Sequence, residues 1–252
     1  MINKSIHLSQ APLSEVLPHS YQMAILPWGA TEPHNLHLPY LTDSILSHQI
    51  ALLGATKALL SDVRVMVLPS VNLGSQNPGQ RSQPFCIHAS YQTQYAILCD
   101  IVDSLAAQGV DKLLILNGHG GNNFKNMVRD LAVSQPCFTI ACAEWYRLVP
   151  EKDFFEHPGD HAGDLETSVM MYLFPELVDL SKAGTGETSG FSIDALNKGI
   201  VWIPRDWSKI SKDTGVGNPL SATSEKGEAF TQAVVDQLAQ VLIDISTKPL
   251  YK

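Results

Sequence analysis

Short apolar runs alternate with longer amphipathic segments along this chain, and that alternation constrains the fold more than any other feature of the sequence. The runs are rich in Val, Ile and Leu, as strands buried on both faces are. Alternating strands and helices are typical of a mostly parallel sheet covered on both sides. We therefore predict an α/β fold, a three-layer α/β/α sandwich with a mostly parallel central sheet, formed by a single domain over residues 1–252. The predicted strands are residues 21–29, 63–69, 112–116 and 137–143.

The amphipathic segments predict helices whose ends carry recognisable signals. We expect Thr42 or Asp43 as the N-cap of the first helix, because both side chains can accept a hydrogen bond from an unpaired N–H group. Gly109 is expected to end the second helix, and Thr223 or Ser224 to cap the last. The predicted helices are residues 42–60, 90–108, 124–133, 165–173 and 223–245.

Two segments, residues 72–89 and 181–221, are rich in Gly, Pro and polar residues and show little periodicity. The first is too long for a simple connection, so a functional loop is a reasonable interpretation. The second carries Trp202 and Trp207, for which the sequence allows a lid or a subunit contact. Aromatic side chains that could line a substrate pocket, or simply pack in the core or at an interface, are Trp28, Trp145, Tyr146, Trp202 and Trp207.

Charge and composition narrow the class of protein. The formal net charge of −8 argues against nucleic-acid binding, which needs a basic surface. No apolar run approaches the roughly 20 residues that span a bilayer, and the N-terminus lacks the apolar core of a signal peptide. We therefore expect a soluble, cytoplasmic protein with no membrane partner. Its cysteines, expected as reduced thiols, are Cys86, Cys99, Cys137 and Cys142.

The first cluster of chemically capable residues lies in residues 31–43, between a predicted strand and a predicted helix. It holds Glu32, His34, His37 and Asp43. Ligands bind beyond the carboxyl ends of strands in open α/β sheets, and carboxylates with imidazoles suit Zn, Mn, Fe or Co. The alternative is a polar loop in which Asp43 only caps a helix.

The second cluster is NGHGGN, residues 117–122, where His119 again follows a strand. Its glycines allow a close backbone approach to a ligand. The pattern is neither a phosphate-binding P-loop nor a dinucleotide fingerprint, which argues against a nucleotide-binding protein. Taken alone, it is equally compatible with a turn that carries a solvent-facing histidine.

The third cluster is HAGDLETS, residues 161–168, at the entry to a helix. Glu166 shares a helix face with Met170 and Leu173, which should be buried, and a buried carboxylate needs a partner such as a metal ion. Asp164 points elsewhere and is more simply explained as a first-turn acid favoured by the helix dipole. Together the clusters supply two histidines and three carboxylates, enough for two metal ions with one bridging Asp.

These motifs resemble those of the creatininase family. GATEPHNLHLPYLTD is similar to that family's first metal motif, G-[ST]-x-E-x-H-G-x-H-L-P-x-x-T-D, while NGHGGN and HAGDLETS are similar to its second and third. The resemblance implies that Glu32 and His34 each bind one of two metals and that Asp43 bridges them. It implies that His119 completes one coordination sphere and Glu166, also assigned a catalytic role, the other.

The resemblance also implies an activity, a cofactor and an assembly. His161 is similar to the family's catalytic histidine beside the substrate. Family members hydrolyse C–N bonds of cyclic or linear amides, including creatinine and formamides, and some are peptidases. They carry Zn, Mn or Fe, of which we expect Zn first, and they are usually homo-oligomers, often hexamers. The expected partner is therefore a small-molecule amide. Residues expected to support the ligands or contact substrate are His37, Asn117, Gly120, Gly121, Asn122 and Asp164.

Three departures from the family pattern bear on specificity. Gly121 stands where creatinine amidohydrolases proper have the metal-binding Glu of GHYEN, so Glu166 should supply the missing carboxylate. Asn35 replaces a Gly that the family usually has at this position, and a positive φ there would be less favourable for Asn than for Gly. Residues 84–90 (PFCIHAS) replace an FPGTISL-like segment and add His88, which is most simply a surface or partly buried histidine.

The predicted mechanism is attack on an amide carbonyl by a water that two metal ions activate, with His161 passing a proton to the leaving nitrogen. Asn117, Asn122 and Asp164 are candidates to orient the imidazoles. A formamide deformylase or a small peptidase on the same site is the alternative within enzymes. A non-catalytic binding protein that retains the fold is the alternative outside them.

Overall fold

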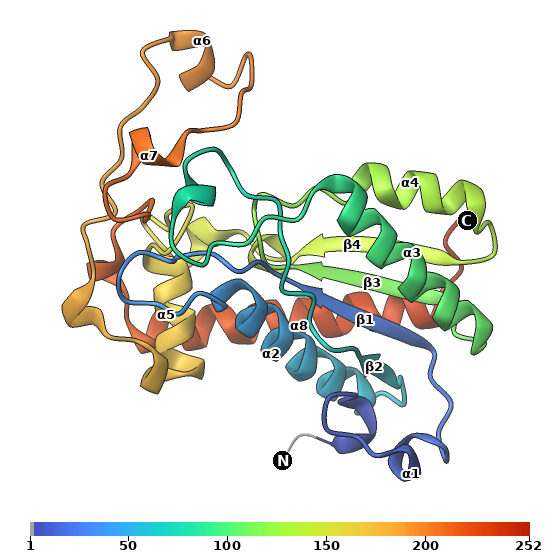
Figure 1. Cartoon of the computed structure of the whole chain (residues 1–252). Coiled ribbons are helices and arrows are strands. Elements are labelled where there is room, and N and C mark those ends of the chain that lie inside the picture. Colours follow the sequence, from blue (N-terminus) through green and yellow to red (C-terminus); the bar gives the residue numbers. More distant parts are fainter. Residues whose placement is uncertain (1–2) are drawn as a thin grey trace.

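A four-stranded parallel sheet lies at the centre of the molecule in the computed structural model, which describes residues 3–252 (Figure 1). The strand order is β2-β1-β3-β4, with Ala24 beside Leu113 in the central pair. The predicted strands and their parallel arrangement are confirmed. The second is shorter than predicted, because only Val65, Met66 and Val67 pair with β1. The strands are β1 (Met23–Trp28), β2 (Val65–Val67), β3 (Lys112–Asn117) and β4 (Thr139–Glu144).

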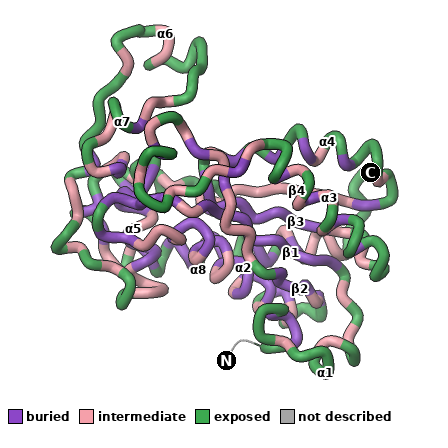
Figure 2. The backbone as a smooth tube through the Cα atoms, viewed as in Figure 1, coloured by how far each residue is buried: buried purple, intermediate pink, exposed green. Residues whose placement is uncertain are grey.

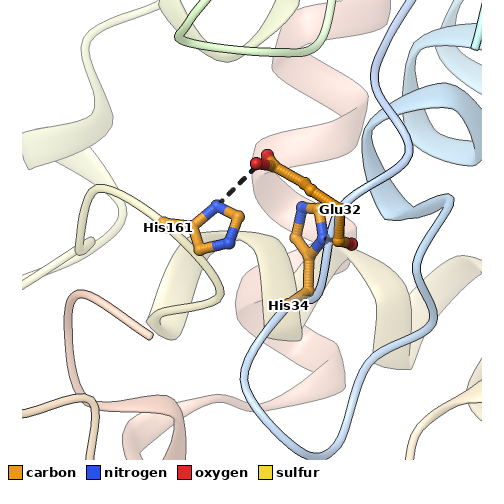
Figure 3. A group of neighbouring side chains, drawn as sticks. All are labelled: Glu32, His34 and His161. Atoms are coloured by element: carbon orange, nitrogen blue, oxygen red, sulfur yellow. Dashed lines mark hydrogen bonds and ion pairs between the residues drawn. The ribbon is translucent and has the colours of Figure 1, made fainter. Parts of the chain in front are cut away.

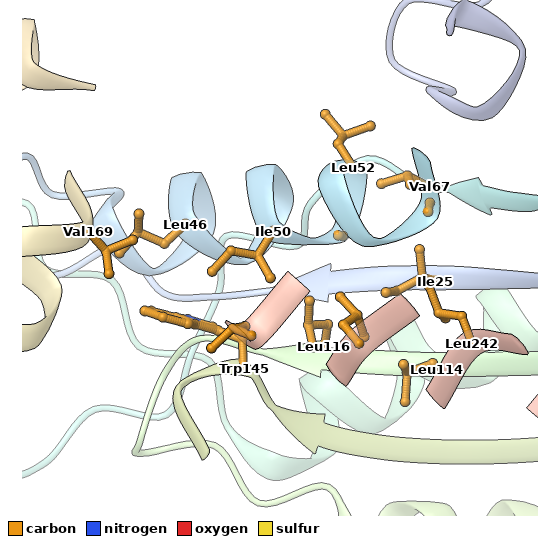
Figure 4. Close-up of a cluster of buried hydrophobic side chains, with 14 of the residues drawn as sticks. Ile25, Leu46, Ile50, Leu52, Val67, Leu114, Leu116, Trp145, Val169 and Leu242 are labelled. Atoms are coloured by element: carbon orange, nitrogen blue, oxygen red, sulfur yellow. The ribbon is translucent and has the colours of Figure 1, made fainter. Parts of the chain in front are cut away.

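Three helices cover one face of the sheet. They are α2 (Thr42–Leu59), α5 (Asp164–Leu173) and α8 (Ser224–Thr247). Their apolar side chains form one continuous core with alternate residues of the strands, for example Ile25 with Leu46 and Leu242 (Figure 4). Burial of these side chains from water is the main stabilising contribution of this layer.

Two helices, α3 (Tyr91–Ala107) and α4 (Lys125–Ser134), cover the opposite face. Their side chains pack against the other set of strand residues, including Ala24 and Leu26, which neighbour Ile25 in β1. Every residue of β1 is therefore buried, as the uninterrupted apolar run predicts. The three-layer α/β/α architecture is confirmed.

The helix ends agree with two of the three predicted signals. The Thr223 side chain accepts a hydrogen bond from the N–H of Lys226 and caps α8, and Gly109, with φ of +79°, follows the end of α3. The predicted cap of α2 is wrong. Its N-cap is Leu41, and the Thr42 hydroxyl donates to the carbonyl of Pro39 instead. The Asp43 carboxylate is engaged by histidine side chains.

Residues 181–221 hold only short elements, as their composition predicts. Residues 189–210, called the arm below, extend from the body beyond a bridge between Thr188 and Ser211. The arm contains α6 (Asp194–Asn197) and α7 (Trp207–Ile210), and much of it is exposed (Figures 1 and 2). The sequence did not predict these two helices or the other short ones. The latter are α1 (Leu13–Val16) and the 3-10 helices Lys4–Ile6, Gln80–Ser82, Trp145–Arg147, Glu151–Asp153, Pro175–Leu177, Leu180–Lys182 and Pro219–Ser221.

The order of the strands creates a point at which the chain changes direction across the sheet. From β1 the chain passes through α2 to β2 on one side, and then through α3 to β3 on the other side of β1. The two crossover helices lie on opposite faces. Loops that leave adjacent strands at such a point diverge and open a crevice at their carboxyl ends. The first two clusters of chemically capable residues lie there.

Across residues 3–252, the helices are all too short or too polar to cross a membrane.

Candidate metal centre

Four separate segments bring the predicted ligands to the carboxyl ends of β1 and β3. Glu32 and His34 lie in the loop after β1, Asp43 in the first turn of α2, His119 in the loop after β3 and Glu166 in the first turn of α5. The exposed fractions of the first four residues do not exceed 4%. Such complete burial of polar groups requires specific partners.

A glycine allows α2 to begin directly on the end of β3. A Cβ atom at Gly118 would lie 2.4 Å from the carbonyl oxygen of Asp43, closer than any real side chain permits. Because Gly118 has no side chain, the first turn of α2 can pack directly against the end of β3. The carboxylate of Asp43 therefore lies between the loops that follow β1 and β3.

The potential ligand atoms form three overlapping sets, within each of which all atoms lie within 4.8 Å of one another. One set is Glu32, Asp43 and His119, and a second is His34, Asp43 and Glu166. Asp43 belongs to both, the arrangement expected of a residue that bridges two ions. The third set joins Glu32 and His34 to His161, whose ring points towards the Glu32 carboxylate (Figure 3).

Main-chain carbonyl groups orient all three imidazoles. His34 Nδ1 lies 3.0 Å from the carbonyl oxygen of Glu32, His119 Nε2 lies 2.8 Å from that of Ser75, and His161 Nε2 lies 2.9 Å from that of Pro33. A carbonyl only accepts, so each of these ring nitrogens carries a proton that it donates. The other nitrogen of each ring then faces the cluster of carboxylates.

The inward nitrogens meet carboxylate oxygens at short range. His34 Nε2 is 2.9 Å from Asp43 Oδ1, and His119 Nδ1 is 2.8 Å from Glu32 Oε1 and 3.1 Å from Asp43 Oδ2. Within residues 3–252, Glu32 Oε1 and Asp43 Oδ2 are buried without a well-aligned hydrogen bond. Lone pairs of imidazole and carboxylate repel each other unless a cation lies between them. The donor set therefore fits divalent ions that accept nitrogen and oxygen ligands.

The electrostatics of the cluster favour positive charge. Burial opposes protonation of His34, yet the Asp43 carboxylate outweighs it and raises the pKa of His34 to about 10. In the same way the Glu32 carboxylate overcomes burial and raises the pKa of His119 well above its usual value. The paired imidazoles in turn lower the pKa values of Asp43 and Glu32 against the effect of burial. Either protons on the imidazoles or metal ions can supply the positive charge that balances the carboxylates. Metal binding must displace the protons from the ligand nitrogens.

Glu166 is the least tightly held of the candidate ligands. Its Oε2 accepts the N–H of Ala162 at 2.5 Å. Burial raises the pKa of this carboxyl group, although His34 partly offsets the effect. A carboxylate whose charge is costly in its surroundings gains most from a nearby cation.

The backbone at Gly121 leaves no room for a side chain. A Cβ atom at this position would lie 2.2 Å from the Ser75 carbonyl oxygen and 2.5 Å from His119 Nε2. With this backbone, no side chain can replace the glycine without breaking the hydrogen bond that orients His119. The metal-binding Glu of the GHYEN motif is therefore incompatible with the loop as it is folded here.

Asn35, which replaces the Gly of the family motif, has a positive φ of 53°. Asn tolerates this conformation better than most residues. Its side chain also compensates locally, because Oδ1 accepts the N–H groups of Leu36 and Gly184. The loop that carries His34 is thus tied to the segment that precedes the arm.

The two predicted supporting asparagines brace the backbone of the His119 loop. Asn117 donates to the carbonyl of His119 at 2.8 Å and accepts its N–H at 3.2 Å. Asn122 donates to Asn117 Oδ1 and to the carbonyl of Gly29. Neither side chain is the partner of an imidazole, a role that the carbonyl groups fill.

Two other predicted supporting residues point away from the ligand atoms. Asp164 accepts hydrogen bonds from Ser168 at 3.0 Å and from Lys226 of α8 at 2.7 Å, so it serves the packing of α5 on α8. His37 Nε2 lies 2.8 Å from the Thr167 hydroxyl. Burial, reinforced by His34, lowers the pKa of His37 to about 4 and keeps it neutral.

Gln80 is a contributor that sequence reasoning missed. Its side chain is 1% exposed and donates to Glu32 Oε2 at 2.6 Å. The bond leaves Oε1 as the oxygen that faces His119 and His161. Residues 72–89 were expected to form a functional loop, but an isolated Gln carries no signal of its own. His88 of that segment is partly buried and accepts the N–H of Gln76.

A cavity of about 860 Å³ opens onto the candidate ligands. Glu32, Asp43, His119, His161 and Glu166 all line it, as do Gly120 and Gly121. Of the aromatic residues considered above, Tyr146, Trp202 and Trp207 line the cavity. Trp28 and Trp145 are fully buried in the cores on opposite faces of the sheet and do not line the cavity. Figure 4 shows Trp145 within the core that α2, α5 and α8 cover.

Comparison with known proteins decides the family. The family model described as creatinine amidohydrolase (Creatininase) matches residues 7–242. This chain belongs to the creatininase family. It is accordingly a hydrolase of the kind that acts on C–N bonds.

Solved structures and curated relatives agree with this membership. A crystal structure of a protein provisionally named creatinine amidohydrolase, from Bacteroides fragilis NCTC 9343, is 55% identical with a TM-score of 0.97, covering 99% of this chain and 100% of that one. A creatininase structure with Mn shares the fold at 21% identity, with a TM-score of 0.75 over 94% and 96% of the two chains.

Two curated creatininase relatives have different activities. The mycofactocin precursor peptide peptidase of Mycobacterium ulcerans (strain Agy99) is 27% identical over 93% of each chain. The creatinine amidohydrolase of Pseudomonas putida is 24% identical over 86% of this chain and 87% of its own. Family membership therefore establishes a hydrolase, while the substrate has to be inferred from the cavity.

Proposed function

We propose that the protein is a metal-dependent amidohydrolase that binds two divalent ions per subunit and hydrolyses the C–N bond of a cyclic or linear amide. The observation that carries this proposal is the position of Asp43, whose two oxygens face two different imidazoles. Glu32, Asp43 and His119 would hold one ion, and His34, Asp43 and Glu166 the other. Zn is the first choice for this mixed nitrogen and oxygen donor set, with Mn or Fe as alternatives.

The bound ions would supply Lewis acidity towards the amide carbonyl and lower the pKa of a water between them. The protein's own groups fix the geometry in which this happens. The carbonyl groups of Glu32 and Ser75 hold the two ligand imidazoles in one tautomer, and Gln80 holds one oxygen of Glu32. This preorganisation lowers the cost of assembling the site when substrate binds.

His161 would transfer the proton to the leaving nitrogen. It is 8% exposed, lines the cavity and donates from Nε2 to the carbonyl of Pro33. Its Nδ1 atom faces the cavity side of Glu32 at 3.7 Å. A proton received at Nδ1 can therefore pass to a substrate nitrogen without any change in the hydrogen bond at Nε2. Because the third set includes His161, a ligand role is the competing assignment for this residue.

A peptidase is the second candidate function. The cavity volume of about 860 Å³ lies near the upper end of the range of ~300–1,000 Å³ that drug-sized ligands occupy. A small cyclic amide such as creatinine would leave most of it empty. Gly121 in place of the GHYEN glutamate also argues against creatinine as the substrate. A non-catalytic role is less consistent with the site, because all five ligand positions hold competent atoms.

The proposal extends to assembly and location. The family resemblance implies a homo-oligomer, with a hexamer as the expected size, and the sequence predicts a cytoplasmic location. The arm presents Ile200, Val201 and Trp202 with exposed fractions of 73%, 52% and 82%, and contiguous apolar side chains of this kind suit a subunit contact. Light scattering coupled to size exclusion measures the assembly directly.

Metal content and turnover test the function together. Elemental analysis of the purified protein should find about two divalent ions per subunit, the stoichiometry of paired-ion hydrolases. The content should fall in Glu32→Ala and Glu166→Ala and stay unchanged in Glu187→Ala, an exposed acid outside the site. A screen of creatinine, formamides and short peptides then follows with the loaded enzyme. A protein that holds no metal as purified, and acquires none when Zn or Mn is added, excludes the proposal.

A further inference from the structure

An arginine of the arm forms part of the cavity wall beside the candidate proton donor. Arg205, His161 and Trp207 all line the cavity. The guanidinium carbon of Arg205 lies 4.6 Å from the centre of the Trp207 ring, and that ring meets the His161 ring edge-on at 5.8 Å between centroids. Arg205 is thus separated from the catalytic histidine by the thickness of one side chain.

Trp207 is a rigid support for this arginine. It is 5% exposed, its indole N–H donates to the carbonyl of Thr214 at 2.9 Å, and its main-chain N–H donates to the carbonyl of Pro78 at 2.7 Å. A guanidinium group that rests on an aromatic face is held in a fixed plane by cation–π attraction. The orientation of Arg205 is therefore set before any ligand arrives.

Most of the hydrogen-bonding capacity of Arg205 is uncommitted. Within residues 3–252 its one ion-pair partner is Asp160, and the two side chains are 36% and 56% exposed. An ion pair that solvent reaches to this degree is screened and weak. A guanidinium group has five N–H donors in a planar fork that matches a carboxylate, so a second acceptor can bind it from the cavity side.

The other cavity arginine is placed differently. Arg147 is 66% exposed and forms an ion pair with Glu144 at 2.9 Å. Its guanidinium carbon lies 5.7 Å from the centre of the Tyr146 ring, farther than the corresponding distance at Arg205. Arg147 lies on the segment after β4 and is not stacked on a residue that contacts His161. It is therefore a matched control for Arg205.

We propose that Arg205 determines substrate specificity by binding a carboxylate, so that the substrates of this enzyme are amides that carry a carboxylate a few bonds from the scissile C–N bond. The inference rests on the proposed metal-dependent function, since it takes the candidate metal centre as the place where the amide binds. The carboxylate accepts hydrogen bonds from the N–H edge of Arg205, in the plane that Trp207 fixes, while the amide carbonyl reaches the candidate ligands. Bidentate contact of this kind also sets the distance between the two groups of the substrate.

Binding of paired hydroxamic acids tests the proposal without knowledge of the natural substrate. A hydroxamate chelates divalent ions and would anchor each probe at the metal centre. The probes are the monohydroxamic acids of malonic, succinic and glutaric acid, each compared with the analogue whose carboxylate is replaced by a primary carboxamide. Calorimetric titration of the metal-loaded protein gives the dissociation constants for wild type, Arg205→Met, Arg205→Lys and Arg147→Met.

The expected result is a preference of at least about tenfold for the carboxylate over the carboxamide at one linker length in wild type, as charge-assisted hydrogen bonds to arginine provide. Arg205→Met should abolish the preference, Arg205→Lys should retain part of it, and Arg147→Met should leave it intact. Equal binding of carboxylate and carboxamide to wild type at every length overturns the role of Arg205 while leaving the metal centre standing. Failure of all hydroxamates to bind the loaded protein counts instead against the proposed function itself.

Discussion

The imidazole of His34 and the carboxylate of Asp43 lie 2.9 Å apart with both side chains almost fully buried. The second oxygen of the same carboxylate lies 3.1 Å from His119, which comes from a different loop. One residue of α2 therefore connects the loops that follow β1 and β3. Loss of its negative charge should affect both halves of the site at once.

Asp43→Asn is expected to remove both ions, or to leave one bound weakly, and to abolish turnover. The amide preserves the shape of the side chain but cannot bridge two cations. We expect metal affinity to fall by more than the about 10- to 100-fold typical of residues that only support a ligand. Elemental analysis after dialysis measures this. A variant that retains two ions and full activity would contradict the bridging role.

Gln80→Leu should weaken metal binding without unfolding the protein. Loss of the hydrogen bond to Glu32 Oε2 frees that carboxylate to rotate, so affinity should fall by about 10- to 100-fold. Competition with a chelator gives the affinity. The control is Gln83→Leu in the same segment, which should behave as wild type. Equal affinities in the two variants would show that Gln80 does not orient Glu32.

Gly121→Ala and Gly120→Ala should behave oppositely although they are adjacent. A Cβ atom at Gly121 collides with the Ser75 carbonyl that orients His119, whereas at Gly120 the nearest atom, the Tyr146 hydroxyl oxygen, is 3.8 Å away. We expect loss of metal and activity in the first variant and wild-type metal content in the second. Metal analysis of the pair checks this, and two similar variants would refute the steric argument.

His37 should make the metal-free protein less stable in acid. Burial lowers its pKa to about 4 in the fold, while an unfolded histidine titrates near 6.5. Between these values the unfolded chain binds the extra proton, so the free energy of unfolding decreases as the pH falls from about 6.5 to 4. His37→Gln removes this dependence. Urea unfolding at pH 7 and pH 5 should therefore show a larger loss in wild type than in the variant.

Lys226→Met should destabilise the fold and leave the metal centre unchanged. The change leaves the Asp164 carboxylate buried without its cation, at a cost of about 1–3 kcal/mol. Lys57→Met breaks the exposed pair with Asp236 and should cost less than about 1 kcal/mol. Urea unfolding compares the two. If Lys226→Met instead lost metal while its stability was unchanged, Asp164 would have a role in the metal centre.

The sequence predicts well that the candidate ligands converge, and the reason is geometric. Glu32 and His119 each follow a strand, and carboxyl ends of parallel strands meet at one edge of a sheet. The buried face of α5 likewise predicts that Glu166 points inward. Residue type and local spacing suffice for these inferences because strand order and helix periodicity convert them into positions.

The remaining features depend on contacts between distant segments that residue types do not encode. The groups that orient the imidazoles are carbonyls of Glu32, Pro33 and Ser75, and every residue has a carbonyl. The position of Gln80 follows from the path of an irregular loop. Asp43 was predicted as a cap from its place at a helix start, but its tertiary partners override the local preference.

The candidate ligands span the chain from residue 32 to residue 166, and none of the three sets is complete within one segment. An unfolded polypeptide therefore offers no comparable arrangement, and ions would bind almost exclusively to folded molecules. By mass action, a rise in free metal stabilises the native state and a shortage lowers its population. The lifetime of this protein in a cell would then depend on the supply of metal. Both the amount of the protein and its catalytic rate would therefore change with that supply.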